Sequence, residues 1–175
     1  MKNTVLAGLL SLGATLPAQA ESTAQIVACT QTVNDYAWYL DHPGDDMSAT
    51  AQAFAQLFTE DAVLRLANAR LEEETFTGHS EIAGRYLQGR DQMRFLHLMS
   101  NIRIQPTSDT TATGTNYVQI FIHPIGASMD DPRGVTGVAE YRDEYRFEDG
   151  VCRISNRYAN LRLLSLQNII QDPKP

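Results

Sequence analysis

Two side chains that could work together as an acid–base pair lie far apart in the sequence. Asp41 ends an amphipathic helical segment, where its negative charge meets the negative end of the helix macrodipole. His97 lies within the very apolar segment 95–99 (FLHLM). Each residue also has an ordinary explanation, because Asp41 can be a solvated carboxylate and a lone histidine is more often a core or edge residue than a catalyst. If His97 is buried beside a carboxylate, however, its imidazole would be suited to act as a general base near neutral pH.

Aromatic and polar side chains of neighbouring segments could line one cavity with this pair. Tyr36, five residues before Asp41, could border its mouth, and Tyr39 lies on a neighbouring face of the same helix. Because side chains alternate between the two faces of a strand, three sets are each expected to share a face: His97 with Met99 and Asn101, Tyr117 with Phe121 and His123, and Tyr141 with Asp143. Alternation does not decide where His97 points, since both faces of its segment could be core. Such a cavity could hold a small, mostly apolar molecule carrying an oxygen or two.

The common signatures of metal sites, nucleotide sites and activated nucleophiles are missing. The chain has no HExxH, CxxC, GxSxG, P-loop or Rossmann glycine pattern. Its four histidines, at positions 42, 79, 97 and 123, have no close ligand spacing. We therefore expect neither a metal site nor a cofactor.

The hydrophobic pattern predicts helices first and a long sheet afterwards. The helical segments are residues 22–41, 48–58 and 80–89, the last with a serine N-cap, and a closing helix at 162–171. The strand segments are a short pair at 62–66 and 75–77, then 94–104, 111–123, 135–147 and 151–161. Asp149-Gly150 predicts a tight hairpin between the last two. This order is typical of a single α+β domain with helices on one face of an antiparallel sheet.

The first twenty residues have the pattern of a secretory signal peptide. Lys2 precedes an apolar run, and Ala18-Gln19-Ala20 fits the small-x-small rule for cleavage before Glu21. The run is too short to span a bilayer, and no cysteine follows the cleavage point to carry a lipid. We therefore expect residues 21–175 to be exported, to the periplasm or beyond the cell, without a membrane anchor.

Export would place the two cysteines, Cys29 and Cys152, in an oxidising compartment where they could form a disulfide. Two buried free thiols are the alternative, and the spacing does not decide between them. The formal net charge is −7, and loss of Lys2 with the leader would make it −8. An acidic chain repels phosphate, so nucleic acid is excluded as a partner.

Several short motifs, in order, resemble the SnoaL-like family of the nuclear transport factor 2-like superfamily. The resemblance covers residues 24–158, and the residues that carry it are Tyr36-Ala37, Leu40-Asp41, the run 57–63 (LFTEDAV), Gly78, Ile82, His97, Asn101, Tyr141-x-Asp143 and the run 149–154 (DGVCRI). It implies a cone-shaped α+β barrel, in which a strongly curved sheet wraps a pocket closed by the N-terminal helices. It also implies a homodimer that uses the outer sheet face. Residues 162–175 would be a C-terminal extension.

The resemblance further implies an activity, because scytalone dehydratase and bile-acid dehydratase pair a helix-end Asp with a strand His. Asp41 and His97 would be that dyad, and Tyr36 occupies a tyrosine position of the bile-acid enzyme. The chain has Leu40 where scytalone dehydratase uses a tyrosine, and Ala139 and Tyr141 where that enzyme has serine and asparagine. Cys152 stands where the family usually has tryptophan, so the substrate need not be the same.

Three functions are therefore compatible with the sequence. The first is a cofactor-independent lyase or isomerase of the dehydratase type, acting on a small carbonyl- or hydroxyl-bearing molecule. The second is a non-catalytic small-ligand-binding or dimerisation module of the same fold, because fold does not fix function. The third is an epoxide hydrolase, which would need Arg65 and Asp143 in the cavity.

Overall fold

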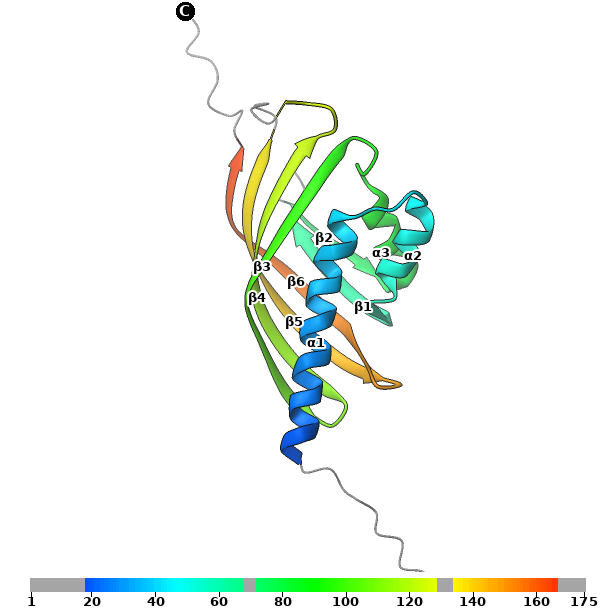
Figure 1. Cartoon of the computed structure of the whole chain (residues 1–175), viewed down its shortest axis with the longest axis vertical. Helices are drawn as coiled ribbons and strands as arrows, with labels where there is room; N and C mark the ends of the chain where they lie inside the picture. Colours follow the sequence, from blue (N-terminus) through cyan, green and yellow to red (C-terminus); the bar gives the residue numbers. More distant parts are fainter. Residues whose placement is uncertain (1–17, 68–71, 129–133, 167–175) are drawn as a thin grey trace, which may run out of the picture.

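The structure is a computed structural model that describes residues 18–67, 72–128 and 134–166, and these residues form three helices and six strands (Figure 1). The helices are α1 (Ala18–Asp41), α2 (Met47–Ala55) and α3 (Gly78–Leu87). The strands are β1 (Phe58–Ala67), β2 (Glu73–Thr77), β3 (Met93–Ser108), β4 (Thr111–Pro124), β5 (Val135–Glu148) and β6 (Val151–Leu166).

The strands form one curved sheet in the order β2-β1-β6-β5-β4-β3. Neighbours are antiparallel except β1 and β6, which run parallel. The predicted α+β class and curved sheet are confirmed, but the sheet is mixed and does not close into a barrel, since β2 and β3 remain its two edges. A parallel pair is possible there because β1 and β6 are joined by a long connection and not by a hairpin.

Helix α1 lies along the concave face of the sheet and is fixed to it at several points (Figure 1). Near its start, the Gln25 side chain donates a hydrogen bond of 2.8 Å to the carbonyl of Asp109 in the β3–β4 turn. Further along, Cys29 forms a disulfide with Cys152 of β6. One turn later, the Thr32 hydroxyl donates to the Cys152 carbonyl at 2.8 Å. These contacts fix where the C-terminal end of α1, and therefore Asp41, lies over the sheet.

Helices α2 and α3 pack beside the C-terminal end of α1 (Figure 1). The Asp46 side chain caps α2 by accepting from the backbone N–H of Ala49 at 2.9 Å. The predicted serine cap on α3 is wrong, because the N-cap position belongs to Thr77 and its side chain makes no cap hydrogen bond. Instead the Glu81 carboxylate reaches back from the fourth residue of the helix and accepts from the Thr77 N–H at 2.7 Å.

The predicted hairpin turn is confirmed, whereas the predicted closing helix is not. Asp149 and Gly150 both have positive φ, 52° and 77°, so the predicted tight turn is confirmed. The closing helix is wrong over its first residues, because β6 continues to Leu166 and pairs with Val135 of β5. The rest of that segment and residues 1–17 of the leader lie outside the described residues. Within the described ranges, no helix combines the length and apolar character needed to cross a membrane.

Candidate active site

A cavity of about 320 Å³ lies between the concave face of the sheet and the ends of α1 and α3. Its wall is mainly apolar and includes Leu40, Phe54, Leu64, Ile120, Ile122 and Leu161. The polar side chains that reach it are Tyr36, Arg85, Tyr86, Gln88, Arg90, His97 and Tyr141. A mostly apolar cavity with a few convergent polar groups is the usual form of a small-molecule site.

Asp41 and His97 are joined by two hydrogen bonds at the edge of this cavity. The Asp41 Oδ1 atom lies 2.7 Å from Nδ1 of His97, and Oδ2 accepts from the backbone N–H of His97 at 2.8 Å. Both side chains are nearly inaccessible, with exposed fractions of 6% for His97 and 9% for Asp41. The carboxylate therefore holds the imidazole and its strand together and fixes the orientation of the ring.

This arrangement sets the protonation of the imidazole. An ionised carboxylate can only accept hydrogen bonds, so Nδ1 of a neutral His97 carries the ring proton and donates it to Asp41. The other ring nitrogen, Nε2, then has a free lone pair, and no group among the described residues forms a hydrogen bond with it. Because His97 lines the cavity, this nitrogen is a base available to a bound molecule.

Two residues, Tyr86 of α3 and Arg90 just after it, hold the end of α1 that carries Asp41. The Tyr86 hydroxyl donates to the Tyr39 carbonyl at 2.8 Å, and Nη1 of Arg90 donates to the Leu40 carbonyl. The guanidinium of Arg90 also lies 4.4 Å from the Tyr86 ring centroid and 4.3 Å from that of Phe95. Burial lowers the pKa of Arg90, while Tyr86 and more distant groups including Asp41 oppose that shift. Arg90 thus satisfies a free carbonyl at the helix C-terminus, where a cation is favoured.

Behind the cavity, Arg157 is completely buried and pairs with Asp143. Its Nε and Nη2 atoms donate to the two carboxylate oxygens at 2.8 and 2.7 Å, and the Tyr145 hydroxyl donates to Oδ2 at 2.7 Å. Burial alone would lower the pKa of Arg157, but Asp143, together with Tyr36 and Tyr145, more than offsets it and the pKa is raised. A buried pair with additional hydrogen bonds of this kind fixes the position of both side chains.

Arg157 in turn supports two tyrosines that line the cavity. Its guanidinium lies 4.1 Å from the Tyr36 ring centroid and 4.5 Å from that of Tyr141, and the two rings meet edge to face at 5.8 Å. Burial raises the pKa of Tyr141 well above its ordinary value, and the neighbouring Tyr36 adds to the shift. Tyr141 therefore stays a neutral O–H donor at physiological pH.

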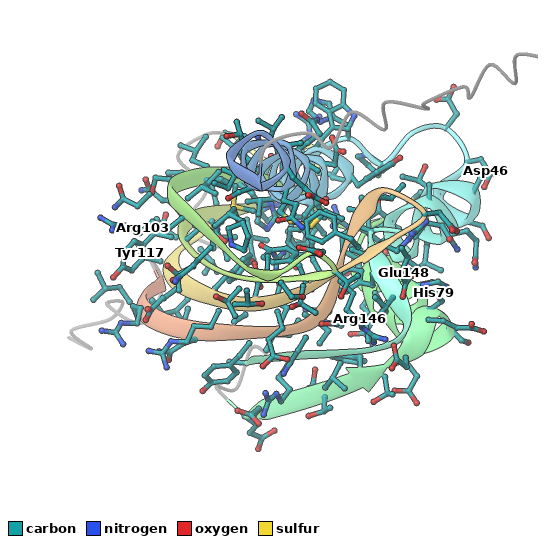
Figure 2. The ribbon with its side chains drawn as sticks, turned by 90° about the horizontal axis from the view of Figure 1, so that it is seen from below. Asp46, His79, Arg103, Tyr117, Arg146 and Glu148 are labelled. Atoms are coloured by element: carbon teal, nitrogen blue, oxygen red, sulfur yellow. A yellow bond between two sulfur atoms is a disulfide. The ribbon has the colours of Figure 1, made fainter. Side chains whose placement is uncertain are left out.

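The structure brings together only part of the predicted site. Tyr36, His97 and Tyr141 line the cavity, Asp41 binds His97, and Asp143 lies behind with Arg157. The other predicted residues are not in the cavity wall: Tyr39, Asn101, Tyr117, Phe121 and His123. Tyr117 is 40% exposed and lies at the outside of the molecule in Figure 2. Arg65, expected for epoxide hydrolysis, also lies outside the cavity and donates to Asn156.

Two features of the sheet explain why the predicted residues of β3 and β4 lie outside the cavity wall. Asn101 has a positive φ of 52° at an irregularity in the β3–β4 pairing, so the alternation that holds for His97 and Met99 shifts by one residue beyond it. On β4 the inward side chains are the even-numbered ones, such as Val118 and Ile120. The predicted set on β4 therefore lies on the opposite face, with its ring side chains directed away from the cavity.

Sequence reasoning missed the three arginines Arg85, Arg90 and Arg157. Charged residues normally lie on the surface, and the residues next to each of these arginines in the sequence do not indicate a partner. Strict alternation along β6 places Arg157 in a polar row with Arg153 and Ser155, and it joins the inward face only because the β5–β6 pairing shifts between Ile154 and Asn156. Among the described residues, no group of three or more His, Cys, Asp or Glu side chains could hold a metal ion.

Comparison with known proteins agrees with the fold. The SnoaL-like domain family matches residues 21–158, while a search of curated protein sequences gave no significant match. Among solved structures, the fold is similar to a protein provisionally named as a scytalone dehydratase from Novosphingobium aromaticivorans, with a TM-score of 0.69 and 19% identity over 85% of this chain and 91% of that one. It is also similar to a type 2 hexachlorocyclohexane dehydrochlorinase, LinA, with a TM-score of 0.69 and 16% identity over 90% and 98% of the two chains.

A third similar structure is a provisionally named aromatic ring hydroxylase from Novosphingobium aromaticivorans, with a TM-score of 0.67 and 20% identity over 86% of this chain and 95% of that one. At such identities the likeness shows the fold alone. The family match spans most of the chain and coincides with the curved sheet and its covering helices. The chain therefore belongs to the SnoaL-like domain family and has the cone fold of the nuclear transport factor 2-like superfamily.

Proposed function

We propose that this protein is a cofactor-independent enzyme of the dehydratase or isomerase type that acts on a small, largely apolar molecule carrying a carbonyl or hydroxyl group. The observation that carries the proposal is the Asp41–His97 pair at the wall of an apolar cavity, with Nδ1 and Oδ1 at 2.7 Å. A base oriented by a buried carboxylate is the arrangement that proton abstraction requires. The names of two similar structures, a dehydratase and a dehydrochlorinase, both denote eliminations.

The reaction would begin when Nε2 of His97 takes a proton from the carbon next to a carbonyl. The C–H electron pair forms the enolate, and Asp41 stabilises the imidazolium that results. The O–H groups of Tyr36 and Tyr141, which line the same cavity, would stabilise the enolate oxygen; one such donor is worth about 3–4 kcal/mol in other enzymes. In a dehydration, the enolate re-forms the carbonyl while the β C–O bond breaks, and the departing hydroxide takes the proton from His97 to leave as water. In an isomerisation, His97 returns the proton to a different carbon.

A non-catalytic binding module remains the second candidate, because the same cavity could simply hold a ligand. This alternative would be favoured if His97 pointed away from the cavity or lay too far from Asp41 for a hydrogen bond. The observed pairing and the position of His97 in the cavity wall therefore support the enzyme. Epoxide hydrolysis receives no such support, because neither Arg65 nor Asp143 lines the cavity.

Export through a cleaved leader is part of the proposal. The disulfide between Cys29 and Cys152 supports it, because disulfides persist in oxidising compartments. The proposed cleavage between Ala20 and Glu21 falls near the start of α1 and before Gln25, whose side chain binds the β3–β4 turn. Expression with the leader, followed by mass spectrometry of the exported protein, should give a chain that begins at Glu21. An uncleaved chain retained in the cytoplasm would contradict export.

We further propose a homodimer that uses the outer face of the sheet. Leu98 and Leu163 are exposed there, at 48% and 68%, and lie on one row through the paired residues Gln119 and Val138. Light scattering should give twice the chain mass for the wild type and the chain mass for Leu98→Lys. The control Val151→Lys changes a residue of equal exposure, 48%, at the β5–β6 hairpin and should leave the dimer intact. A wild-type monomer would contradict the proposal.

The enzymatic proposal can be tested with a simple β-hydroxy ketone, 4-hydroxy-4-phenylbutan-2-one, whose dehydration gives a conjugated enone that absorbs in the near ultraviolet. The wild type should accelerate enone formation over buffer, and His97→Ala should lose about 100-fold or more of that rate. Equal rates for the wild type and His97→Ala, or no acceleration by either, would favour the binding module.

A further inference from the structure

The charges around the cavity are unbalanced. Two arginines, Arg85 and Arg90, line it, whereas no Asp or Glu of the described residues does. The carboxylate next to the cavity, Asp41, uses both oxygens to bind His97. An anionic ligand that enters the cavity would therefore meet positive charge that no carboxylate among the described residues of the cavity wall compensates.

Arg90 already has a structural task. Its Nε and Nη1 atoms donate to the carbonyls of Tyr86 and Leu40, and its guanidinium is stacked against two aromatic rings. Those two carbonyls belong to the C-terminal ends of α3 and α1, and both helix ends, together with the more distant Asp41, favour its positive charge. Arg90 is therefore accounted for without a ligand.

Arg85 has no comparable task. Its Nε atom is buried and has no hydrogen-bond partner, and no carboxylate of the described residues forms an ion pair with it. The nearest aromatic contact is distant, with the guanidinium 6.0 Å from the centroid of the Phe76 ring. Its position in the last turn of α3 is favourable for a cation, but it supplies no counter-charge for a guanidinium that lines the cavity wall.

A second donor lies beside Arg85 at the same end of the cavity. Gln88, the residue that ends α3, is exposed and also lines the cavity, so this end is near solvent. Its amide can donate to an oxygen, and a guanidinium binds a carboxylate through two parallel hydrogen bonds. The remaining wall, from Phe54 to Ile120 and Leu161, is apolar.

We propose that the substrate is a carboxylic acid, whose carboxylate is bound by Arg85 with help from Gln88 while its apolar body fills the cavity and presents the reacting carbon to His97. This deepens the proposed function, on which it rests, by assigning a charged group to the substrate. A neutral molecule of the same size would not pair with the charge of the Arg85 guanidinium and should bind more weakly.

The test compares two probes of the same shape, 2-naphthoate and 2-naphthamide, by isothermal titration calorimetry. The wild type should bind the carboxylate about tenfold more tightly than the amide, equivalent to about 1.4 kcal/mol. Added salt should weaken binding of the carboxylate and leave the amide nearly unchanged. Arg85→Gln should reduce the preference to less than about twofold, and Arg85→Lys, which keeps the charge but not the planar fork, should keep part of it.

The matched control is Arg103→Gln, which removes the same charge from an exposed residue of β3 (Figure 2) and should keep the full preference. The salt titration on the wild type remains decisive even if an Arg85 variant fails to fold. The proposal is overturned if the wild type shows no preference for the carboxylate, or if Arg85→Gln keeps it. Carboxylate preference should survive in His97→Ala, so failure of the enzymatic proposal can be told apart from failure of this one.

Discussion

The carboxylate of Asp41 accepts two hydrogen bonds from one residue, from Nδ1 and from the backbone N–H of His97, at 2.7 and 2.8 Å. The ring and the strand that carries it are thus held by the same group, which itself sits at the end of α1. This explains why a negative charge is present at a helix end where the macrodipole disfavours it. The charge is placed there for its contact with β3 and not for the stability of the helix.

The disulfide between Cys29 and Cys152 should be a major contributor to stability. It joins α1 to β6 across 123 residues of sequence, and removal of a native disulfide from a small domain costs about 2–5 kcal/mol. The variant Cys29→Ala/Cys152→Ala should show this loss in urea unfolding. Dithiothreitol should destabilise the wild type by a similar amount and leave the double variant unchanged. An identical urea midpoint for oxidised and reduced wild type would contradict a structural role.

The ion pair between Arg157 and Asp143 should be intolerant of single substitutions. Both side chains have an exposed fraction of 0%, so Asp143→Asn leaves a buried guanidinium without its counter-charge, at a cost of about 3–5 kcal/mol. The matched control is Asp61→Asn, which removes an exposed aspartate from its pair with Arg146 and should barely move the urea midpoint. If the two variants lowered the urea midpoint by similar amounts, burial would not determine how much an ion pair contributes to stability.

The buried hydroxyl of Tyr141 should lower the free energy of unfolding at alkaline pH. Burial raises its pKa well above the ordinary value of 10.0, with Tyr36 adding to the shift, so the folded chain keeps a proton that the unfolded chain releases. The stability that Tyr141 contributes is complete below pH 10.0 and is lost as the pH rises from there towards the folded-state pKa. Urea unfolding above pH 10 should show a shallower decline for Tyr141→Phe than for the wild type. Tyr117→Phe, at an exposed position, should decline as the wild type does, and an unchanged slope in Tyr141→Phe would contradict the assignment.

Arg90 is a positioning residue for the dyad, because it binds the Leu40 carbonyl beside Asp41. Arg90→Met should let the end of α1 shift and lower proton abstraction by about 10- to 100-fold, whereas Arg90→Lys should restore part of the rate. The Nδ1–H proton of His97, observed by NMR, should change its resonance in Arg90→Met. If both the rate and this resonance stay as in the wild type, Arg90 has only a structural role.

The sequence predicts the order of the elements well, because helical and strand periodicities are local properties. It also identifies Tyr36, His97 and Tyr141, which line the cavity, and Asp41, which binds His97. The predicted face of β4 is wrong, although the sequence holds a signal for the right one. The even-numbered Val118, Ile120 and Ile122 are aliphatic, whereas Tyr117 shares its face with polar residues such as Gln119. The parallel pairing of β1 with β6 and the positive φ of Asn101 depend on long-range contacts that periodicity does not encode. The arginines were missed because their environments are made by segments far apart in the sequence.

The dyad can be tested without knowing the natural substrate, by following loss of deuterium from 1,1-dideuterated 2-tetralone in water by proton NMR. This ketone is small and apolar, and the exchange requires only that a base removes a proton next to the carbonyl. The wild type should accelerate the exchange over buffer. His97→Ala should lose about 100-fold or more of that acceleration, and Asp41→Asn should lose a comparable factor, because the imidazole is then held in the wrong tautomer. The control His123→Ala removes a histidine outside the cavity wall and should exchange at the wild-type rate. Wild-type exchange rates in both His97→Ala and Asp41→Asn would contradict the account.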